Sequence, residues 1–400
     1  MDRRNKVLLF FGSGISFDSG LPSVDQLSKR ILSISPRELG PMHSFCESSS
    51  PINNPKRALG AQQFLKWLAE FSAGNGLICP NYEDFYSLCQ KIEQSTYAPG
   101  MDPTLRQLVD FIREKAITTE FFESNEKSLQ ECALQARLFI EYTVKQELLI
   151  AERTPKNLEK IIDYIEILGP ENLDIITLNH DTLIEQQLEG RKDWTDGFED
   201  RQACRDSSAN GETIPYAIDF YSGAALSVNR KVRLLKPHGS CNWYQYLRNG
   251  SWLWGIPRSG FRQIILQADG TPISENPEAA GILSGSFTKE RSYLFWQTGA
   301  MFRHAYRILH EYDRVICSGY GWKDFGINEM FIEWVQKSDQ KRILILESSK
   351  GENYQTIDRL TSQWTKRNLG RSEIHPEWLS EADPRDALRM VSVEPKPNRE

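Results

Sequence analysis

The residues best suited to chemistry follow two apolar runs of the sequence. Asn179 and Asp181 come just after residues 173–178, and His238 comes just after residues 232–235. An imidazole titrates near neutral pH and can act as a general base, and an asparagine amide can both donate and accept a hydrogen bond. Each residue also has a structural interpretation, because a histidine can simply be a surface residue, and Asn179 and Asp181 can cap a strand-to-helix turn.

A glycine turn precedes these residues in the chain. Gly12-Ser13-Gly14-Ile15-Ser16 follows the apolar residues 6–11 and is expected to lead into a helix. Glycines let backbone N–H groups approach a phosphate, and a helix N-terminus carries partial positive charge. The turn therefore predicts a phosphate site, although a strand-to-helix turn with two glycines can also be purely structural.

Five apolar, β-rich runs are expected to position these residues. Each run is followed by glycine or polar residues, and the five are residues 6–11, 173–178, 232–235, 314–317 and 342–346. Continuously apolar strands are typical of a parallel sheet whose two faces are both covered. Ligands bind such sheets at the carboxyl ends of the strands. The sequence thus predicts an α/β fold, a Rossmann-like parallel sheet with helices on both faces.

The segments between the strands predict further modules. Apolar residues at three- and four-residue spacing predict an inserted helical module over residues 61–170, which leaves residues 1–60 and 171–383 for the sheet domain. Residues 243–302 are rich in Gly, Trp and Ser and are expected to form a second insertion, built of loops and a hairpin. Residues 384–400 are expected to be a flexible tail.

Longer motifs carry a resemblance to a known family. The string GSGISFDSGLP (residues 12–22) resembles the sirtuin signature, in which G-A-G-I-S is followed by S-G-[IL]-P. Residues 177–181 resemble the sirtuin T-x-N-x-D segment, residues 236–240 its H-G motif, and residues 318–321 its second glycine turn. These motifs keep the family order and cover about half of the chain. The resemblance implies NAD binding by Gly12, Ser13, Gly14, Ser16, Gly20, Pro22, Gly319, Tyr320, Asp324 and Glu347.

The chain departs from deacylating sirtuins in two places. Its seven cysteines form no C-x-x-C pair, so neither a zinc ribbon nor a bound metal is expected. The loop after Pro22 reads Ser-Val, where deacylases have Asp-Phe-Arg. In both respects the chain is similar to the SIR2-like bacterial domains that act as NADases in antiphage defence. Its size and architecture resemble the SIR2 subunit that operates with a separate HerA-type ATPase.

The resemblance implies an NAD+ glycohydrolase, which releases nicotinamide and ADP-ribose. Nicotinamide leaves through an oxocarbenium-like transition state and needs no acid, because it is already cationic. His238 is then the general base, Asn179 holds a ribose hydroxyl or the attacking water, and Asp181 orients Asn179 or contacts nicotinamide. The glycine turns cradle the pyrophosphate, and Glu347 lies on the adenosine side. His180 occupies a variable position of its motif and is expected to be structural.

Charge and hydropathy restrict the other classes of function. The chain has 48 Lys and Arg against 54 Asp and Glu, a formal charge of −6, which disfavours autonomous nucleic-acid binding. A nuclease is further disfavoured because no carboxylates cluster as metal ligands would. No apolar run approaches the roughly 20 residues that span a bilayer, and no signal peptide is recognisable. A cytoplasmic protein without a membrane segment is expected.

Two alternatives to the hydrolase stay open. One is a non-catalytic sensor or scaffold that binds NAD or ADP-ribose within a defence complex. The other is a protein deacylase, which the missing zinc module and the altered loop disfavour. An unregulated NAD hydrolase would deplete its own host, so the isolated chain is expected to be largely inactive until it forms a homo-oligomer or meets a partner.

Overall fold

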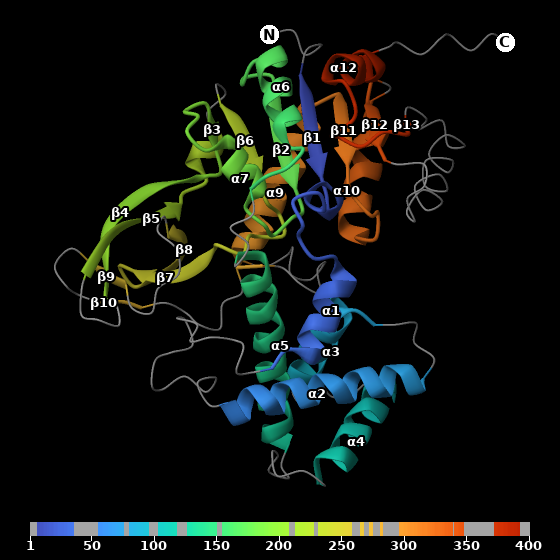
Figure 1. The fold of residues 1–400 in the computed structure, drawn as a ribbon, viewed down its shortest axis with the longest axis vertical. Coiled ribbons are helices and arrows are strands. Elements are labelled where there is room, and N and C mark those ends of the chain that lie inside the picture. Colours follow the sequence, from blue (N-terminus) through green and yellow to red (C-terminus); the bar gives the residue numbers. More distant parts are fainter. Residues whose placement is uncertain are drawn as a thin grey trace.

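The computed structural model consists of a parallel sheet domain, a helical module at one end of it and an antiparallel sheet at its side (Figure 1). The structure describes residues 6–35, 55–75, 80–95, 103–117, 126–149, 154–207, 213–227, 231–257, 265–267, 272–274, 281–282, 296–338, 340–347 and 372–392. The helical module adjoins the edge of the parallel sheet at which β1 and β2 end.

Seven strands form the central sheet, in the order β13-β12-β11-β1-β2-β6-β3. Its strand pairings are parallel. The strands are β1 (Val7–Phe11), β2 (Leu173–Thr177), β3 (Trp194–Thr195), β6 (Val232–Leu235), β11 (Arg314–Ser318), β12 (Arg342–Leu346) and β13 (Ser372–His375). The five predicted strands are confirmed. The two edge strands β3 and β13 were not predicted, because β3 has two residues and β13 is only partly buried and lacks an apolar run.

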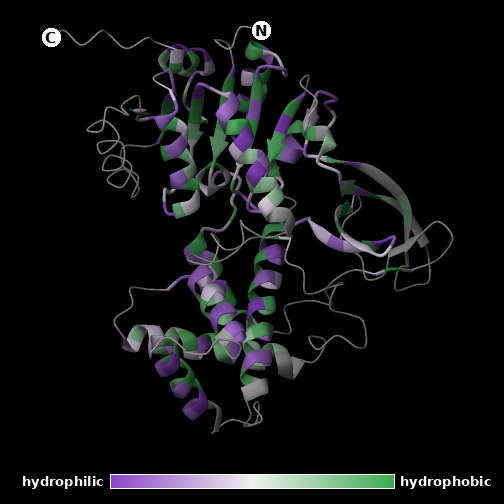
Figure 2. Cartoon of the chain, turned by 180° about the vertical axis from the view of Figure 1, so that it is seen from behind, coloured by the Kyte–Doolittle hydropathy of each residue, from purple (hydrophilic) through white to green (hydrophobic). Residues whose placement is uncertain are grey.

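Helices cover both faces of this sheet, as predicted. On one face, Leu8 and Phe10 of β1 join a core shared with α9 (Trp296–Glu311) and α10 (Phe325–Gln336). On the other face, the alternate β1 residues join a core shared with α6 (Glu159–Leu168), α7 (Leu183–Leu188) and α12 (Pro384–Ser392). Figure 2 shows the hydrophobic strands enclosed by helices that carry one polar side. The continuous apolar runs follow from this double burial.

In its described residues, the helical module consists of five helices around one core. They are α1 (Val24–Ser33), α2 (Pro55–Gly74), α3 (Tyr82–Ser95), α4 (Pro103–Ile117) and α5 (Glu126–Leu149). Arg137 of α5 donates to Glu93 and Glu141, and Tyr86 donates to Glu141 at 2.7 Å, so the charges in this core are paired. Burial of paired charges fixes how α3 packs on α5.

Two boundaries predicted from the sequence are wrong. The module extends beyond 61–170 at its start, since α1 packs in it, whereas α6 packs on the sheet instead. The expected flexible tail begins with α12, which buries Pro384, Ala387 and Val391. This helix has a strong apolar stripe on a short, mostly polar segment, and such a stripe is stable only when a sheet covers it. Residues 393–400 lie outside the described part.

A six-stranded antiparallel sheet lies beside the sheet domain, in the order β10-β9-β4-β5-β8-β7. Its strands are β4 (Phe198–Ser207), β5 (Thr213–Tyr221), β7 (Tyr244–Arg248), β8 (Ser251–Pro257), β9 (Ile265–Gln267) and β10 (Pro272–Ile273). The predicted hairpin is β7 with β8. Two segments of the chain build this sheet, because β4 and β5 precede β6 of the central sheet. The first of these segments was not predicted, since the many charged residues of β4 hide the strand pattern. Residues 258–264, 268–271, 275–280 and 283–295 of the predicted insertion lie outside the described part.

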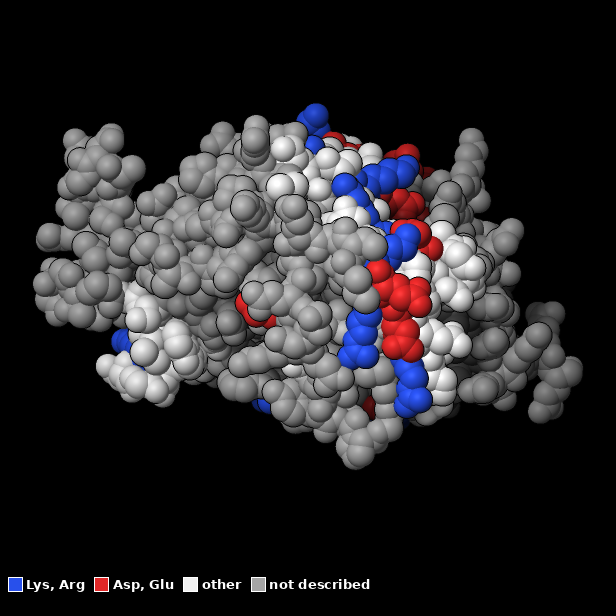
Figure 3. Space-filling view, turned by 90° about the horizontal axis from the view of Figure 1, so that it is seen from below, with Lys and Arg blue, Asp and Glu red and all other residues white. Residues whose placement is uncertain are grey.

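The charged side chains of the helical module are of both signs. Figure 3 shows Lys and Arg side chains beside Asp and Glu side chains on this end of the molecule. Lys115 of α4 pairs with Glu70 of α2 at 2.6 Å, and Arg113 lies 3.9 Å from Asp110. Within the described residues, none of the helices is apolar over a length that would cross a membrane.

Candidate active site

A cavity of about 500 Å³ lies at the carboxyl ends of β1, β2, β6, β11 and β12. The predicted site residues that line it are Gly12, Ser13, Gly14, Ser16, Pro22, Asn179, Asp181, His238, Gly319, Tyr320, Asp324 and Glu347. Gly20 does not line the cavity. Its φ of +75° closes a turn in which its N–H donates to the Phe17 carbonyl at 2.8 Å, so its role is in the shape of the loop.

The two glycine turns interlock at the cavity floor. The Gly14 N–H donates to the Gly319 carbonyl at 2.9 Å. A Cβ on Gly12 would lie 2.5 Å from the Gly319 carbonyl oxygen, and a Cβ on Gly319 would lie 2.6 Å from the Ile15 nitrogen. Gly319 also has a φ of +66°, a conformation that other residues adopt only at a cost. Both turns need glycine because the backbones touch.

The segment after the first glycine turn differs from the expected helix. It forms a single 3₁₀ turn, Ser13–Ser16, and α1 begins only at Val24, where Ser23 and Gln26 make a capping box. The chain therefore leaves the sheet domain and enters the helical module directly after the turn. The turn still lines the cavity, but its Gly14 N–H donates to the Gly319 carbonyl, and the dipole of a long helix does not reach the cavity.

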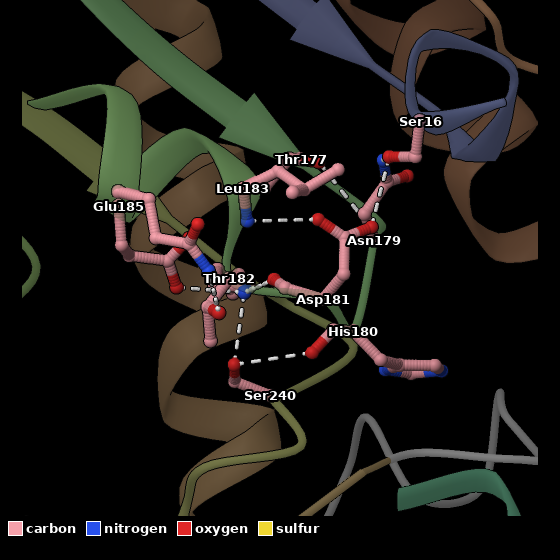
Figure 4. Close-up of polar contacts among 11 residues, drawn as sticks. Ser16, Thr177, Asn179, His180, Asp181, Thr182, Leu183, Glu185 and Ser240 are labelled. Atoms are coloured by element: carbon pink, nitrogen blue, oxygen red, sulfur yellow. Dashed lines mark hydrogen bonds and ion pairs between the residues drawn. The ribbon is translucent and has the colours of Figure 1, made fainter. Parts of the chain in front are cut away.

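A buried hydrogen-bond chain holds Asn179. Its Nδ2 donates to the Ser16 Oγ at 2.8 Å, and the Ser16 Oγ donates to Asp181 Oδ2 at 2.9 Å (Figure 4). Asp181 Oδ1 in turn accepts from the Leu183 N–H at 3.0 Å, where α7 begins. Asp181 thus orients Asn179 through Ser16, and the Ser16 hydroxyl is used inside the protein. Among the described residues, no group hydrogen-bonds the buried Asn179 Oδ1.

A buried lysine joins the loops that follow β2 and β6. Lys236 Nζ donates to the Asp181 carbonyl, to Glu185 at 2.7 Å and to the Ser240 Oγ at 2.8 Å. The carbonyl of His180 accepts from the Ser240 hydroxyl and from the Cys241 N–H. These bonds fix the loop after β2 against the loop after β6, which carries His238.

His238 is paired with a carboxylate from a third strand end. Its Nε2 lies 3.1 Å from Asp324 Oδ2, and both side chains are buried. Asp324 also caps α10, since its Oδ1 accepts from the Ile327 N–H at 3.1 Å. A carboxylate that is itself fixed can hold an imidazole in one orientation and stabilise its protonated form. The sequence predicted Asp324 as a binding residue and did not predict this pair.

Tyr320 and Glu347, which follow β11 and β12, also line the cavity. The Tyr320 ring packs edge-on against the Phe10 ring, with 5.4 Å between the ring centroids. The Tyr320 hydroxyl donates to Asn328 Oδ1 at 2.9 Å. Only part of Tyr320 therefore faces the cavity. Glu347 follows β12, and burial raises the pKa of its carboxyl from 4.5 to about 7. A carboxylate at a strand end can accept hydrogen bonds from ribose hydroxyls.

The helical module and the C-terminal segment supply walls that the sequence analysis missed. Residues 81–84 at the start of α3, together with Val24, Leu27 and Leu148, line the cavity. The Asn81 side chain accepts from the Glu83 N–H at 2.8 Å and caps α3. Its residue type therefore indicates a helix start, and nothing in the local sequence indicates a cavity. Trp378 also lines it, from the segment after β13.

His180 lies at the cavity, although it was expected to be structural. It lines the cavity, and its ring lies 6.2 Å from the ring of His238. Figure 4 shows that this ring points away from Ser16, on the opposite side of the loop from Asn179 and Asp181. Among the described residues, no three His, Cys, Asp or Glu side chains are grouped as metal ligands would be.

Comparisons with known proteins give structural neighbours only. No family model matches the sequence, and no curated protein matches it. Among solved structures, the chain is similar to Sir2Tm bound to a propionylated peptide, with 11% identity and a TM-score of 0.34 over 97% of this chain and 94% of that one. It is also similar to a mutant Sir2 homologue in complex with ADP-ribose, with 11% identity and a TM-score of 0.32 over 90% and 92%.

Proposed function

We propose that the chain is a SIR2-like NAD+ glycohydrolase that releases nicotinamide and ADP-ribose. The observation that carries this proposal is that a fixed amide side chain and an imidazole–carboxylate pair line the same cavity. Asn179 is held by Ser16 while its Oδ1 is buried and unused, and His238 is held by Asp324. A site that only binds a nucleotide needs the glycine turns, but it has no use for an imidazole–carboxylate pair.

The residues that line the cavity suit the parts of a dinucleotide. Gly12, Gly14 and Gly319 line the cavity without side chains, so a pyrophosphate can approach the backbone closely there. Glu347 at the far strand end suits the adenosine ribose. Asn179 Oδ1 is an acceptor for a hydroxyl of the other ribose or for water, and a buried acceptor without a partner is costly until a ligand satisfies it.

The proposed reaction assigns one task to each residue. The oxygen of a water molecule bonds to C1′ of the ribose, and the C1′–N bond breaks with its electron pair going to nicotinamide, which leaves neutral. The proton of the water goes to His238, whose positive charge Asp324 then stabilises. Asn179 orients the ribose or the water, and Asp181 and Ser16 position Asn179. The assignment predicted for Asp181, orientation of Asn179, therefore passes through Ser16.

The biological setting stays a prediction from the resemblance. An NAD-depleting effector of antiphage defence would be cytoplasmic, would assemble as a homo-oligomer and would act with a HerA-type ATPase. In that setting NAD+ is the substrate, and no metal takes part. α1 connects the first glycine turn directly to the helical module, so contacts made by the module have a short path to the cavity.

The test is hydrolysis by the purified chain. NAD+ is incubated with the parent chain, His238→Ala and Asn179→Ala, each at high chain concentration and with a HerA-type ATPase added, and nicotinamide and ADP-ribose are measured by chromatography. We expect equimolar products from the parent and a loss of about a hundredfold or more in each variant. His304→Ala, which changes a histidine of α9, is the matched control and keeps the parent rate.

The outcomes separate the candidate functions. Turnover that survives His238→Ala contradicts the mechanism. Binding of ADP-ribose without turnover, at high chain concentration and with a HerA-type ATPase added, favours the sensor or scaffold. Consumption of NAD+ only when an acylated lysine peptide is present favours a deacylase.

A further inference from the structure

The turn between β11 and α10 contains a strained residue. Trp322 has a φ of +55°, a conformation that a bulky side chain adopts only at a cost. The residue is nevertheless buried, and its ring packs on the rings of Tyr320 and Phe331, with centroid distances of 4.9 and 5.5 Å. The surrounding structure therefore holds this turn in a shape that its own sequence does not favour. Backbone strain that is maintained in this way is concentrated at functional sites.

The side chain of Asn328 closes this turn. Its Nδ2 donates to the Trp322 carbonyl at 3.0 Å, and its Oδ1 accepts from the Tyr320 hydroxyl at 2.9 Å. That hydroxyl also lies 3.1 Å from the Asp324 carbonyl oxygen, which accepts from the Asn328 N–H at 3.0 Å. Asn328 thus ties the strained residue and the last residue of the turn to α10.

This turn brings Asp324 to the cavity. Asp324 lines the cavity, and its Oδ2 lies 3.1 Å from His238 Nε2. Because a loop separates Asp324 from β11, the hydrogen bonds of the sheet do not hold it, and the shape of the turn decides where its carboxylate lies. A displacement of about 1 Å would lengthen this contact beyond a hydrogen bond. Misplacement of that size can reduce a rate about a hundredfold.

The Asp324 carboxylate also decides which nitrogen of His238 is the base. An ionised carboxylate can only accept a hydrogen bond, so the neutral imidazole carries its proton on Nε2, and Nδ1 is the basic nitrogen. If the carboxylate moves away, this preference is lost and both tautomers are populated. The shape of the turn therefore affects the proton transfer proposed for His238, in addition to the stability of the fold.

We propose that Asn328 is a positioning residue of the candidate active site. By holding the Trp322 carbonyl it keeps Asp324 in place, and Asp324 keeps His238 in the tautomer whose Nδ1 takes the proton of the water. Asn328 is not among the described residues that line the cavity, so it acts through Asp324. This inference rests on the proposed function for the reaction, but the tautomer of His238 can be measured without turnover.

The first experiment measures the kinetics of NAD+ hydrolysis, at high chain concentration and with a HerA-type ATPase added. Asn328→Ala removes both hydrogen bonds of the side chain and replaces asparagine with a better helix former. We expect kcat to fall about tenfold and KM for NAD+ to stay within about threefold of the parent. In an Asp324→Asn chain the same substitution is expected to change kcat by less than about twofold, because it acts through that carboxylate.

Asn172→Ala is the matched control. Asn172 Nδ2 donates to the Leu168 carbonyl at 2.7 Å, at the end of β2 that is opposite the cavity. This variant loses a bond of the same kind and keeps the parent kcat. Asn328→Asp tests the proposal if Asn328→Ala does not fold, because it keeps the size of the side chain and the acceptor for Tyr320. It cannot donate to the Trp322 carbonyl and is expected to lose kcat as Asn328→Ala does.

The second experiment needs no turnover. The nitrogen chemical shifts of ¹⁵N-labelled histidines report the tautomer at a pH where the imidazole is neutral, and the signals of His238 are identified by their loss in His238→Ala. We expect the Nε2–H tautomer in the parent and in Asn172→Ala, and a mixture of both tautomers in Asn328→Ala and Asp324→Asn. This result in a chain that does not hydrolyse NAD+ supports the role of Asn328 and contradicts the proposed function.

Three results would overturn the role of Asn328. The first is a parental kcat in Asn328→Ala. The second is an equal loss of kcat on this substitution in the parent and in the Asp324→Asn chain, because Asn328 would then act independently of the carboxylate. The third is a His238 tautomer that is the same in the parent and in both Asn328 variants.

Discussion

The carboxyl edge of the parallel sheet and the helical module face the same cavity, but they contribute to it differently. The sheet edge supplies Asn179, His238 and Asp324 from three separate strand ends, each held by a hydrogen bond to another buried group. The module supplies residues 81–84 and Leu148 from the start of α3 and from α5. One region holds polar atoms in fixed positions, and the other closes the space in front of them.

This difference shows how the two regions can vary. Hydrogen bonds to the neighbouring strands hold each strand end in place, so a short loop after it positions a side chain accurately. The helices of the module instead pack around a core of their own. We expect substitutions at the sheet edge to change turnover, and substitutions on the module to change access and substrate affinity.

The largest expected effect is on the pair that orients the imidazole. Asp324→Asn keeps an oxygen acceptor for the Ile327 N–H and so keeps the cap of α10, but it removes the charge beside His238. We expect kcat to fall about a hundredfold, with the unfolding midpoint nearly unchanged, as measured by steady-state kinetics and urea unfolding. Asp386→Asn on the exposed surface of α12 serves as control. A variant with parental kcat would show that His238 works without its carboxylate.

Contact between the glycine turns is tested next. Gly12→Ala places a Cβ 2.5 Å from the Gly319 carbonyl oxygen, and such overpacking costs about 1–3 kcal/mol. Gly74→Ala at the end of α2 meets no atom within 4 Å and is expected to raise the free energy of unfolding by up to about 1 kcal/mol, because Ala is the better helix former. Urea unfolding of both variants measures the contrast between the two regions. Equal stability of the two variants would show that the turns are not tightly packed.

The third prediction concerns pH and Glu347. Burial raises the pKa of its carboxyl from 4.5 to about 7, so between these values the folded chain binds more protons than the unfolded chain. Stability should therefore fall as the pH rises from about 4.5 to about 7 and stay level above. The unfolding midpoint of Glu347→Gln, followed over this range beside the parent, should fall less. If the unfolding midpoints of the parent and Glu347→Gln change with pH in the same way, the pKa of the Glu347 carboxyl is not raised by burial.

The smallest effect is expected on the module. Glu83→Gln keeps the size of a side chain that lines the cavity, and we expect kcat to stay within about threefold of the parent, since a wall residue takes no part in proton transfer. KM for NAD+ can change more than kcat does. A tenfold loss of kcat would mean that α3 takes part in the chemistry, and the contrast drawn between the two regions would then be wrong.

The sequence by itself determined the parallel sheet and the strand ends at which the site lies. Five continuous apolar runs can be stable only between two covered faces, so the strands and their polar carboxyl ends followed from local pattern. Residues such as Asn179 and His238 were found for the same reason, because a few residues link each to its strand. β4 and α12 were missed, since a charged strand and a short amphipathic helix depend on partners far along the chain.

Tertiary structure alone decided which side chains meet. Ser16 and Asp181 are 165 positions apart and hydrogen-bonded, and His238 meets Asp324 because β6 and β11 end at the same edge of one sheet. The approach of residues 81–84 and Trp378 to the cavity had no local signal either. A sequence pattern reports which face of an element is buried. The partner on that face is set by the order of strands and by packing between modules.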